Sequence, residues 1–320
     1  MRRLMGAAAF GALLVGAVFA IGPREPVHLT PRAGAADLGA DLAADIAAHE
    51  AGVDPDLAAR VIWAGAPGAQ TDWAVIYLHG FSATPQEIRP VPDRVAAGLG
   101  ANLYFARLAG HGQGGDAMAG PTVRDWMDDT ARALAIGHRL GRRVLVIATS
   151  TGGTLAAEAA RQQGLGGQID ALVLISPNFG LNSSAATILT WPFARHWGPL
   201  VAGRERCFDP INADHARFWT TCYPTVALFP MAALADHAAR GDYADARQPL
   251  LVLTAGADQV VSPATTAQVA ARWGGPVTAQ QLVMGPGDDP YAHVIAGDIL
   301  SPSQTGPVSD LILDWARAID

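Results

Sequence analysis

The chain has 320 residues, of which 50% are hydrophobic and 16% are charged. It is therefore too apolar for a disordered protein and long enough to bury a large core. All 22 basic residues are arginines, set against 29 acidic residues, and the net charge of −7 argues against a nucleic-acid partner.

The first residues, Met1–Ile21, predict an export signal or a membrane anchor. Two arginines precede the uncharged apolar run Leu4–Ile21, and Gly22-Pro23 ends it. Cleavage after Ala20 is one expectation. The other is retention as a helix of about 27 Å, which nearly spans a bilayer. In both cases the rest of the chain is periplasmic, secreted or membrane-anchored outside the cytoplasm.

After an Ala-rich connector and a short helix in Asp41–His49, apolar runs alternate with helical stretches. Four early runs are short and β-branched or aromatic, as strands buried on both faces are: Trp73–Leu78, Asn102–Phe105, Val144–Ile147 and Ala171–Ile175. The predicted helices between them are Pro85–Leu99, Val123–Leu140 and Gly153–Gln163. The pattern resumes with a strand at Leu250–Thr254, a helix at Pro263–Trp273, a strand at Thr278–Met284 and a helix at Val308–Ala318. This order predicts an α/β fold with a mostly parallel central sheet flanked by helices.

Between Pro177 and Gln248 the alternation stops, and the segment is rich in aromatic and turn residues. It indicates an inserted cap at about 178–248, whose aromatic side chains line a pocket or form a small local core. The predicted organisation is an N-terminal segment 1–22, an extension 23–71, and a main domain 72–320 that contains the cap.

Ser150 carries the sharpest chemical signal. It follows the buried strand and precedes the helical run Leu155–Ala160. A serine exposed on a tight strand-to-helix turn needs small residues two positions before and after it, and Ala148 and Gly152 meet that need. We interpret Ser150 as a nucleophile; the alternative is a serine that caps the helix.

A serine nucleophile needs a base, and His293 is the candidate. It lies on a polar loop after the last predicted strand, at the edge of a parallel sheet where functional loops gather. The alternative is a surface histidine. Asp258, just past the strand Leu250–Thr254, is the candidate acid that orients it, with Asp288 and Asp289 as rivals.

The order Ser150, Asp258, His293 is typical of one fold. The chain from Asp72 onward resembles the α/β-hydrolase family, and within it the monoglyceride lipase and small bacterial carboxylesterase group. The matching segments are Leu78–Thr84, like the first oxyanion loop, Ala109–Gly112, Val123–Trp126, Gly256–Asp258 and His293. Ala148 departs from the first glycine of the Gly-x-Ser-x-Gly pattern. The resemblance implies a cap between the sixth and seventh sheet strands.

The resemblance also implies a mechanism. Ser150 attacks an acyl carbonyl, His293 moves the proton, and the backbone N–H groups of Phe81 and Thr151 form the oxyanion hole. No cofactor is required. His79 and His111 lie beside glycines ahead of the nucleophile, and we interpret them as structural or site-shaping.

We therefore expect a serine ester hydrolase for small to medium acyl chains, with monoacylglycerols and lysolipids as candidate substrates. A peptidase or acyltransferase using the same triad is the alternative. A noncatalytic binding protein on this fold is a further one, although such proteins usually lack a triad member. The expected partner is a small ester or lipid-like molecule, with membrane association through the N-terminal segment.

The two cysteines, Cys207 and Cys222, lie in the predicted cap and match no zinc-ligand spacing, so no metal is expected. In an oxidising compartment they are well placed to form a disulfide, which would stabilise a small subdomain by about 3 kcal/mol. The alternative is two buried thiols.

Overall fold

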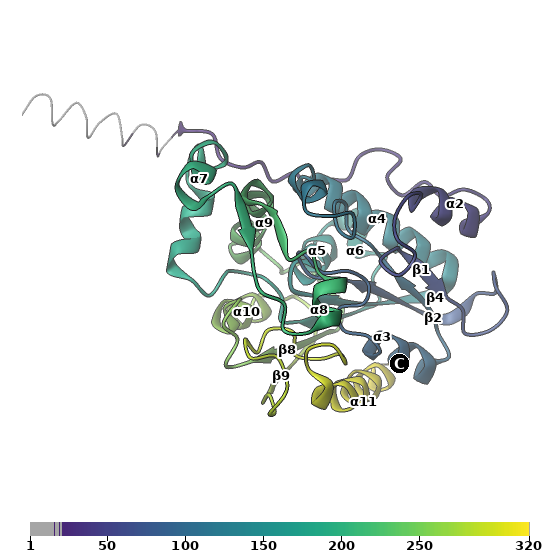
Figure 1. Ribbon diagram of the computed structural model, residues 1–320. Helices are drawn as coiled ribbons and strands as arrows, with labels where there is room; N and C mark the ends of the chain where they lie inside the picture. The colour runs from purple at the N-terminus through teal and green to yellow at the C-terminus, as the bar shows by residue number, and fades with distance from the viewer. Residues whose placement is uncertain (1–15, 17–18, 20, 320) are drawn as a thin grey trace, which may run out of the picture.

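The computed structural model describes residues 16, 19 and 21–319 (Figure 1). Most of the predicted export signal or anchor therefore lies outside the described residues. No helix in the described part of the chain is long and apolar enough to cross a membrane.

The core of the molecule is a seven-stranded sheet with the order β1-β3-β2-β4-β5-β8-β9. Only β1 is antiparallel to its neighbour, β3, which confirms the mostly parallel α/β sheet that the sequence predicts. The strands are β1 (Arg60–Ile62), β2 (Thr71–Leu78), β3 (Asn102–Phe105), β4 (Gly141–Thr149), β5 (Ala171–Ile175), β8 (Leu250–Ala255) and β9 (Val277–Leu282).

Helices cover both faces of the sheet (Figure 1). Alternate residues of each strand point to opposite faces, so that Val146 packs with one core cluster and Leu145 with the other. Helices α3 and α11 pack together on one face, and α4 and α5 lie on the other. The helices outside the cap are α2 (Leu42–His49), α3 (Val91–Leu99), η1 (Asp116–Ala119), α4 (Val123–Leu140), α5 (Ser150–Ala160), α6 (Gln163–Gly166), α10 (Pro263–Ala270) and α11 (Pro302–Ala318).

Several helix boundaries differ from the sequence prediction for reasons of backbone chemistry. The helix expected from Pro85 begins only at Val91, because Pro90 lacks an N–H and disfavours helical conformation at the residue before it. The last helix begins six residues before the predicted Val308, at Pro302, since proline suits the first turn of a helix.

The insertion between β5 and β8 forms a cap at the carboxyl edge of the sheet. It holds η2 (Ser184–Thr190), α7 (Ala194–Ala202), β6 (Glu205–Cys207), α8 (Ala213–Phe218), β7 (Cys222–Pro224), η3 (Thr225–Ala227) and α9 (Leu228–Ala239). In chain order β5 and β8 are the fifth and sixth strands of the sheet, so the expected place between the sixth and seventh strands is wrong. Only one strand of the sheet, β1, precedes β2 in the chain. Each later strand therefore comes one place earlier in the order than the resemblance implies.

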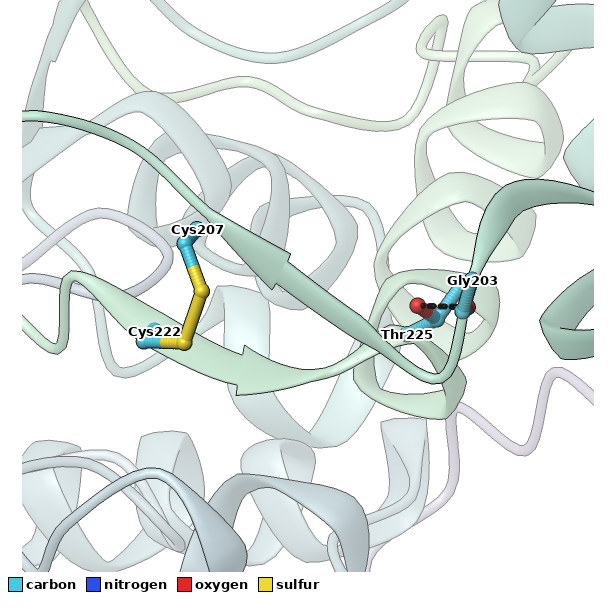
Figure 2. Close-up of a disulfide and its surroundings, with 4 residues drawn as sticks. All are labelled: Gly203, Cys207, Cys222 and Thr225. Carbon is cyan, nitrogen blue, oxygen red and sulfur yellow. Dashed lines mark hydrogen bonds between the residues drawn. A yellow bond between two sulfur atoms is a disulfide. The ribbon is translucent and has the colours of Figure 1, made fainter.

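A disulfide joins Cys207 on β6 to Cys222 on β7, which confirms the predicted pairing (Figure 2). Both cysteine residues are exposed, unlike the buried thiols of the alternative. At the other end of the same pair of strands, the Thr225 hydroxyl donates to the Gly203 carbonyl at 2.6 Å. The two small strands are therefore fastened at both ends.

The extension ahead of β2 contacts both the cap and the core. Phe193 of the cap donates its N–H to the Pro23 carbonyl at 2.8 Å, and Arg195 pairs with Glu25 at 2.9 Å. Further along, Glu50 and Arg107 form a buried ion pair at 2.5 Å. Because β1 also belongs to this extension, part of it is built into the central sheet.

Candidate active site

Ser150 lies on a strained turn between β4 and α5. Its φ of 51° is in the left-handed region, which non-glycine residues rarely adopt. A Cβ at Gly152 would lie 2.4 Å from the Leu78 carbonyl oxygen, so only glycine fits there. Ala148, in contrast, is fully buried at a β4 position paired with Leu78.

The structure brings together the three residues that the sequence singled out. His293 Nδ1 lies 2.9 Å from Asp258 Oδ2, and His293 Nε2 lies 3.1 Å from Ser150 Oγ. A carboxylate only accepts hydrogen bonds, so the ring proton is assigned to Nδ1 and Nε2 is free to accept the serine proton. This is the arrangement in which a histidine acts as general base for a serine.

The two rival aspartates have other partners. Asp288 accepts hydrogen bonds from the Gly285 N–H at 2.7 Å and from the Ser303 side chain at 2.5 Å. Asp289 accepts the backbone N–H groups of His293 and Val294, both at 2.9 Å. Asp289 thus holds the backbone of the histidine loop, while Asp258 alone among these three bonds to the imidazole ring.

The surroundings of His293 act on its pKa in opposite directions. Burial of the ring lowers the pKa, whereas the hydrogen bond that the ring donates to Asp258 and the charges of Asp258, Glu87 and Asp289 raise it. The net effect is a pKa above the ordinary value for histidine. The site therefore favours the imidazolium form that a general base becomes when it accepts a proton.

Phe81 and Thr151, the expected oxyanion residues, both line the cavity beside Ser150. The Phe81 ring packs edge-on against Tyr223 of the cap and His111 of the core. Ser82, the next residue, accepts a hydrogen bond from the Thr220 N–H of the cap at 2.7 Å. The loop that carries Phe81 is therefore held between cap and core.

His79 and His111 take the structural roles that the sequence suggests. His79 bridges the Gly80 carbonyl at 2.8 Å and the Leu108 N–H at 3.1 Å, which makes it neutral with the proton on Nδ1. Burial and the neighbouring His111 hold the pKa of His79 well below its usual range. Burial likewise lowers the pKa of His111 to about 4.

Ser150 opens into a cavity of about 610 Å³ between the sheet edge and the cap. Most of its cap wall is apolar or aromatic, formed by Leu189, Phe208, Ile211, Trp219, Tyr223, Leu228 and Met231 among others. Some of the aromatic residues that marked the insertion in the sequence thus line the pocket. A cavity of this size and polarity suits a small organic molecule.

One group of described side chains has the spacing of metal ligands, namely Glu205, Cys207 and Cys222. The two sulfur atoms are bonded to each other, so neither is a thiolate.

Sequence reasoning missed two residues of the site. In the sequence Asp289 stands out only as a rival acid, and Glu87, which is buried and lines the cavity, is not among the predicted site residues. The available signal was a glutamate that follows the oxyanion loop within a few residues. Its partners become visible only in three dimensions.

Comparison with known proteins places these observations in a family. The family model described as serine aminopeptidase, S33, an α/β-hydrolase family, matches residues 69–285. No curated protein matches the chain.

Solved structures similar to this chain share its fold. A metagenome-derived lipolytic enzyme has a TM-score of 0.64 at 20% identity, covering 79% of this chain and 98% of its own. The monoacylglycerol lipase of Paleococcus ferrophilus has a TM-score of 0.60 at 14% identity, covering 82% and 99%. A soluble variant of monoglyceride lipase from Saccharomyces cerevisiae, in complex with a substrate analogue, has a TM-score of 0.60 at 10% identity, covering 82% and 91%. With the family match over most of its length, the chain belongs to the serine aminopeptidase S33 family of α/β hydrolases and is a serine hydrolase.

Proposed function

We propose that this protein hydrolyses carboxylic esters with small to medium acyl chains, and that Ser150, His293 and Asp258 are its catalytic triad. The observation that carries the proposal is the hydrogen-bonded series from Asp258 through His293 to Ser150, in which His293 and Ser150 line a largely apolar cavity. Monoacylglycerols and lysolipids are substrates of suitable chemistry, because an apolar cap wall can bind an acyl chain.

The reaction has two halves. Ser150 Oγ forms a bond to the ester carbonyl carbon while His293 Nε2 takes the serine proton, and the carbonyl oxygen becomes an oxyanion. The oxyanion accepts hydrogen bonds from the backbone N–H groups of Phe81 and Thr151, each worth about 3 to 4 kcal/mol of transition-state stabilisation. The carbon–oxygen bond of the leaving alcohol then breaks, and His293 delivers its proton to that alcohol.

Water completes the cycle. His293 removes a proton from a water molecule that attacks the acyl-enzyme carbonyl, and collapse of the second tetrahedral intermediate releases the carboxylic acid and restores Ser150. Asp258 keeps the imidazole in one tautomer and stabilises its cation in both halves. The reaction needs no group beyond the chain, the ester and water.

The test is a panel of p-nitrophenyl esters of graded acyl length, assayed with wild type and Ser150→Ala side by side. We expect turnover by wild type and a loss of about 10⁴-fold or more in Ser150→Ala, with the melting temperature unchanged. A fluorophosphonate probe should label Ser150. Turnover by pure Ser150→Ala, or labelling at another residue, would refute the assignment. An aminoacyl anilide in the panel tests peptidase activity, the alternative use of the triad.

We also propose that the catalytic domain works outside the cytoplasm. The Cys207–Cys222 bond supports this, since structural disulfides persist mainly in oxidising compartments. Intact mass after thiol alkylation, without reductant, is the measurement. Two alkylated thiols in protein recovered from the periplasm or the medium would count against it.

A further inference from the structure

Glu87 is a buried carboxyl beside the reacting atoms that the triad mechanism does not use. Its residue is only 2% exposed, in the segment between β2 and α3, and it lines the cavity with Ser150. Its Oε2 atom accepts two hydrogen bonds, from the Gly80 N–H at 2.7 Å and from the Tyr77 hydroxyl at 2.6 Å. Burial raises the pKa of Glu87, and the two donors that converge on one oxygen act against it by stabilising the ionised carboxylate.

The first of these bonds acts on the loop that carries an oxyanion donor. Glu87 fixes the N–H of Gly80, and His79 Nδ1 donates to the carbonyl of the same residue at 2.8 Å. The Gly80 carbonyl and the Phe81 N–H belong to one planar trans peptide and point in opposite directions. Fixing both ends of Gly80 therefore fixes the direction of the Phe81 N–H.

Glu87 also sets the distance between this loop and the nucleophile. A Cβ at Gly80 would lie 2.7 Å from Glu87 Oε1 and 3.2 Å from Ser150 Cβ, so the glycine backbone is packed between the two residues. On the other side, the Tyr77 hydroxyl that donates to Glu87 lies 3.2 Å from Thr149 Oγ1, whose hydroxyl can donate to it in turn. Thr149 is the residue before Ser150, so one buried network joins the loop to the nucleophile turn.

The charge of Glu87 also acts on the general base. The acidic groups that face His293 are Asp258 on the loop after β8, Glu87 on the segment after β2 and Asp289 on the loop of His293 itself. Of these, Asp258 bonds to the ring and Asp289 bonds to the backbone, whereas Glu87 makes no hydrogen bond to His293. Its influence on His293 is therefore electrostatic.

We propose that Glu87 is a positioning residue for this reaction, holding the oxyanion loop against Ser150 through the Gly80 N–H and stabilising the protonated form of His293 through its charge. This inference rests on the proposed esterase function. The proposal gives Glu87 two effects, one through its hydrogen bonds and one through its charge. An isosteric and a truncating substitution of this residue can measure the two effects separately.

Glu87→Gln keeps an oxygen that can accept from Gly80 and Tyr77 but removes the charge. We expect kcat to fall less than about tenfold, and the midpoint of the acid limb of kcat/KM to move to lower pH, because the carboxylate that raises the His293 pKa is gone. Glu87→Ala removes the acceptor as well. With the loop released, we expect kcat to fall about 100-fold or more while KM changes less than about threefold, which is the effect of losing one oxyanion donor.

The matched control is Glu158→Gln. Glu158 is also a fully buried glutamate that accepts from a tyrosine hydroxyl, Tyr243, at 2.9 Å, but it pairs with Arg161 and does not line the cavity. This variant should lower the melting temperature and leave the midpoint of the acid limb unchanged. A shift of equal size in Glu158→Gln would overturn the electrostatic half of the proposal.

The decisive measurement does not depend on turnover. The pKa of His293, followed by NMR titration of its ring signals, should be lower in Glu87→Gln than in wild type. An unchanged pKa, or a folded Glu87→Ala with kcat within tenfold of wild type, would overturn the proposal. If Glu87→Ala does not fold, the titration of Glu87→Gln still decides. Absence of ester turnover and of Ser150 labelling in wild type would instead refute the proposed function, whatever the titration shows.

Discussion

The carboxyl edge of the sheet and the cap above it are built in different ways. At the edge, Ser150, Asp258 and His293 each follow a strand of the central sheet, and their loops are fixed by hydrogen bonds such as those that Asp258 accepts from the Val260 and Val261 N–H groups. The cap has two strands of three residues each, joined by an exposed disulfide. The sheet edge thus determines the geometry of the reaction, and the cap determines the shape of the cavity.

The largest effect should come from the edge. Asp258→Asn leaves a side chain of the same size but no longer selects the imidazole tautomer, so we expect kcat to fall about 10⁴-fold. Asp289→Asn should give a smaller loss, because it weakens the support of the His293 backbone and removes one of the charges that raise the His293 pKa, but leaves the bond from the ring to Asp258. Asp288→Asn should be close to wild type in kcat. Steady-state kinetics of the three purified variants test the ranking, and a larger loss in Asp288→Asn than in Asp258→Asn would give the role to the rival.

The disulfide tests the cap. Replacing both Cys207 and Cys222 by serine opens a bridge between residues separated by 15 positions, and should cost about 3 kcal/mol. We expect faster proteolysis within the cap and a higher KM for the longest esters of the panel, because Phe208 and Tyr223 of the cavity wall adjoin the two cysteines. Wild type treated with reductant is the matching control. A double variant with unchanged protease resistance would show that the bridge does not stabilise the cap.

The pH dependence tests the electrostatics of the edge. Because the His293 pKa is raised, the base takes up a proton at a higher pH than an ordinary histidine, and kcat/KM should fall on acidification with a midpoint above about 6.5. Each further pH unit below the midpoint should lower kcat/KM about tenfold. Rates measured from pH 5 to 8 in buffers of constant ionic strength give the midpoint. A flat profile over that interval is the contrary result.

The smallest effect should come from the departure at Ala148. Ala148→Gly restores the family's first glycine, removes one buried methyl group and loosens the strand, so it should cost about 1 kcal/mol of stability and leave kcat within about threefold. Gly152→Ala is the contrasting variant. Its Cβ would lie 2.4 Å from the Leu78 carbonyl oxygen, so we expect the turn that carries Ser150 to be displaced and kcat to fall sharply. A tenfold increase of kcat in Ala148→Gly would show that the alanine impairs the nucleophile.

The same difference between edge and cap explains what could be predicted from the sequence. Runs such as Ala171–Ile175 are apolar throughout because both faces of the strand are buried, and this pattern is local. Ser150 and Asp258 could be chosen because each follows such a run, and His293 because it lies on the loop after the last predicted strand. The three-residue strands β6 and β7 carry no comparable pattern, and the cysteines were the one signal there.

The role of Glu87 could not be predicted for a related reason. Its partners Tyr77 and Gly80 are close in sequence, but Thr149 and His293 reach it only through the sheet and the histidine loop. The start of α3 was mistaken because Pro85, Pro90 and Pro92 each suit a first helical turn, and the sequence does not say which one begins the helix.

The contacts of residues 23–59 have a practical consequence for anyone who shortens this chain. A form that begins at residue 69, where the match to the family begins, would lose Pro23 and Glu25, which fasten α7, and Glu50, which neutralises the buried Arg107. An unpaired buried arginine is strongly destabilising. Trimming would therefore disturb the cap through α7 and the core through Arg107. A low yield or an altered preference for acyl chain length in such a form would result from the lost contacts and would not describe the full chain.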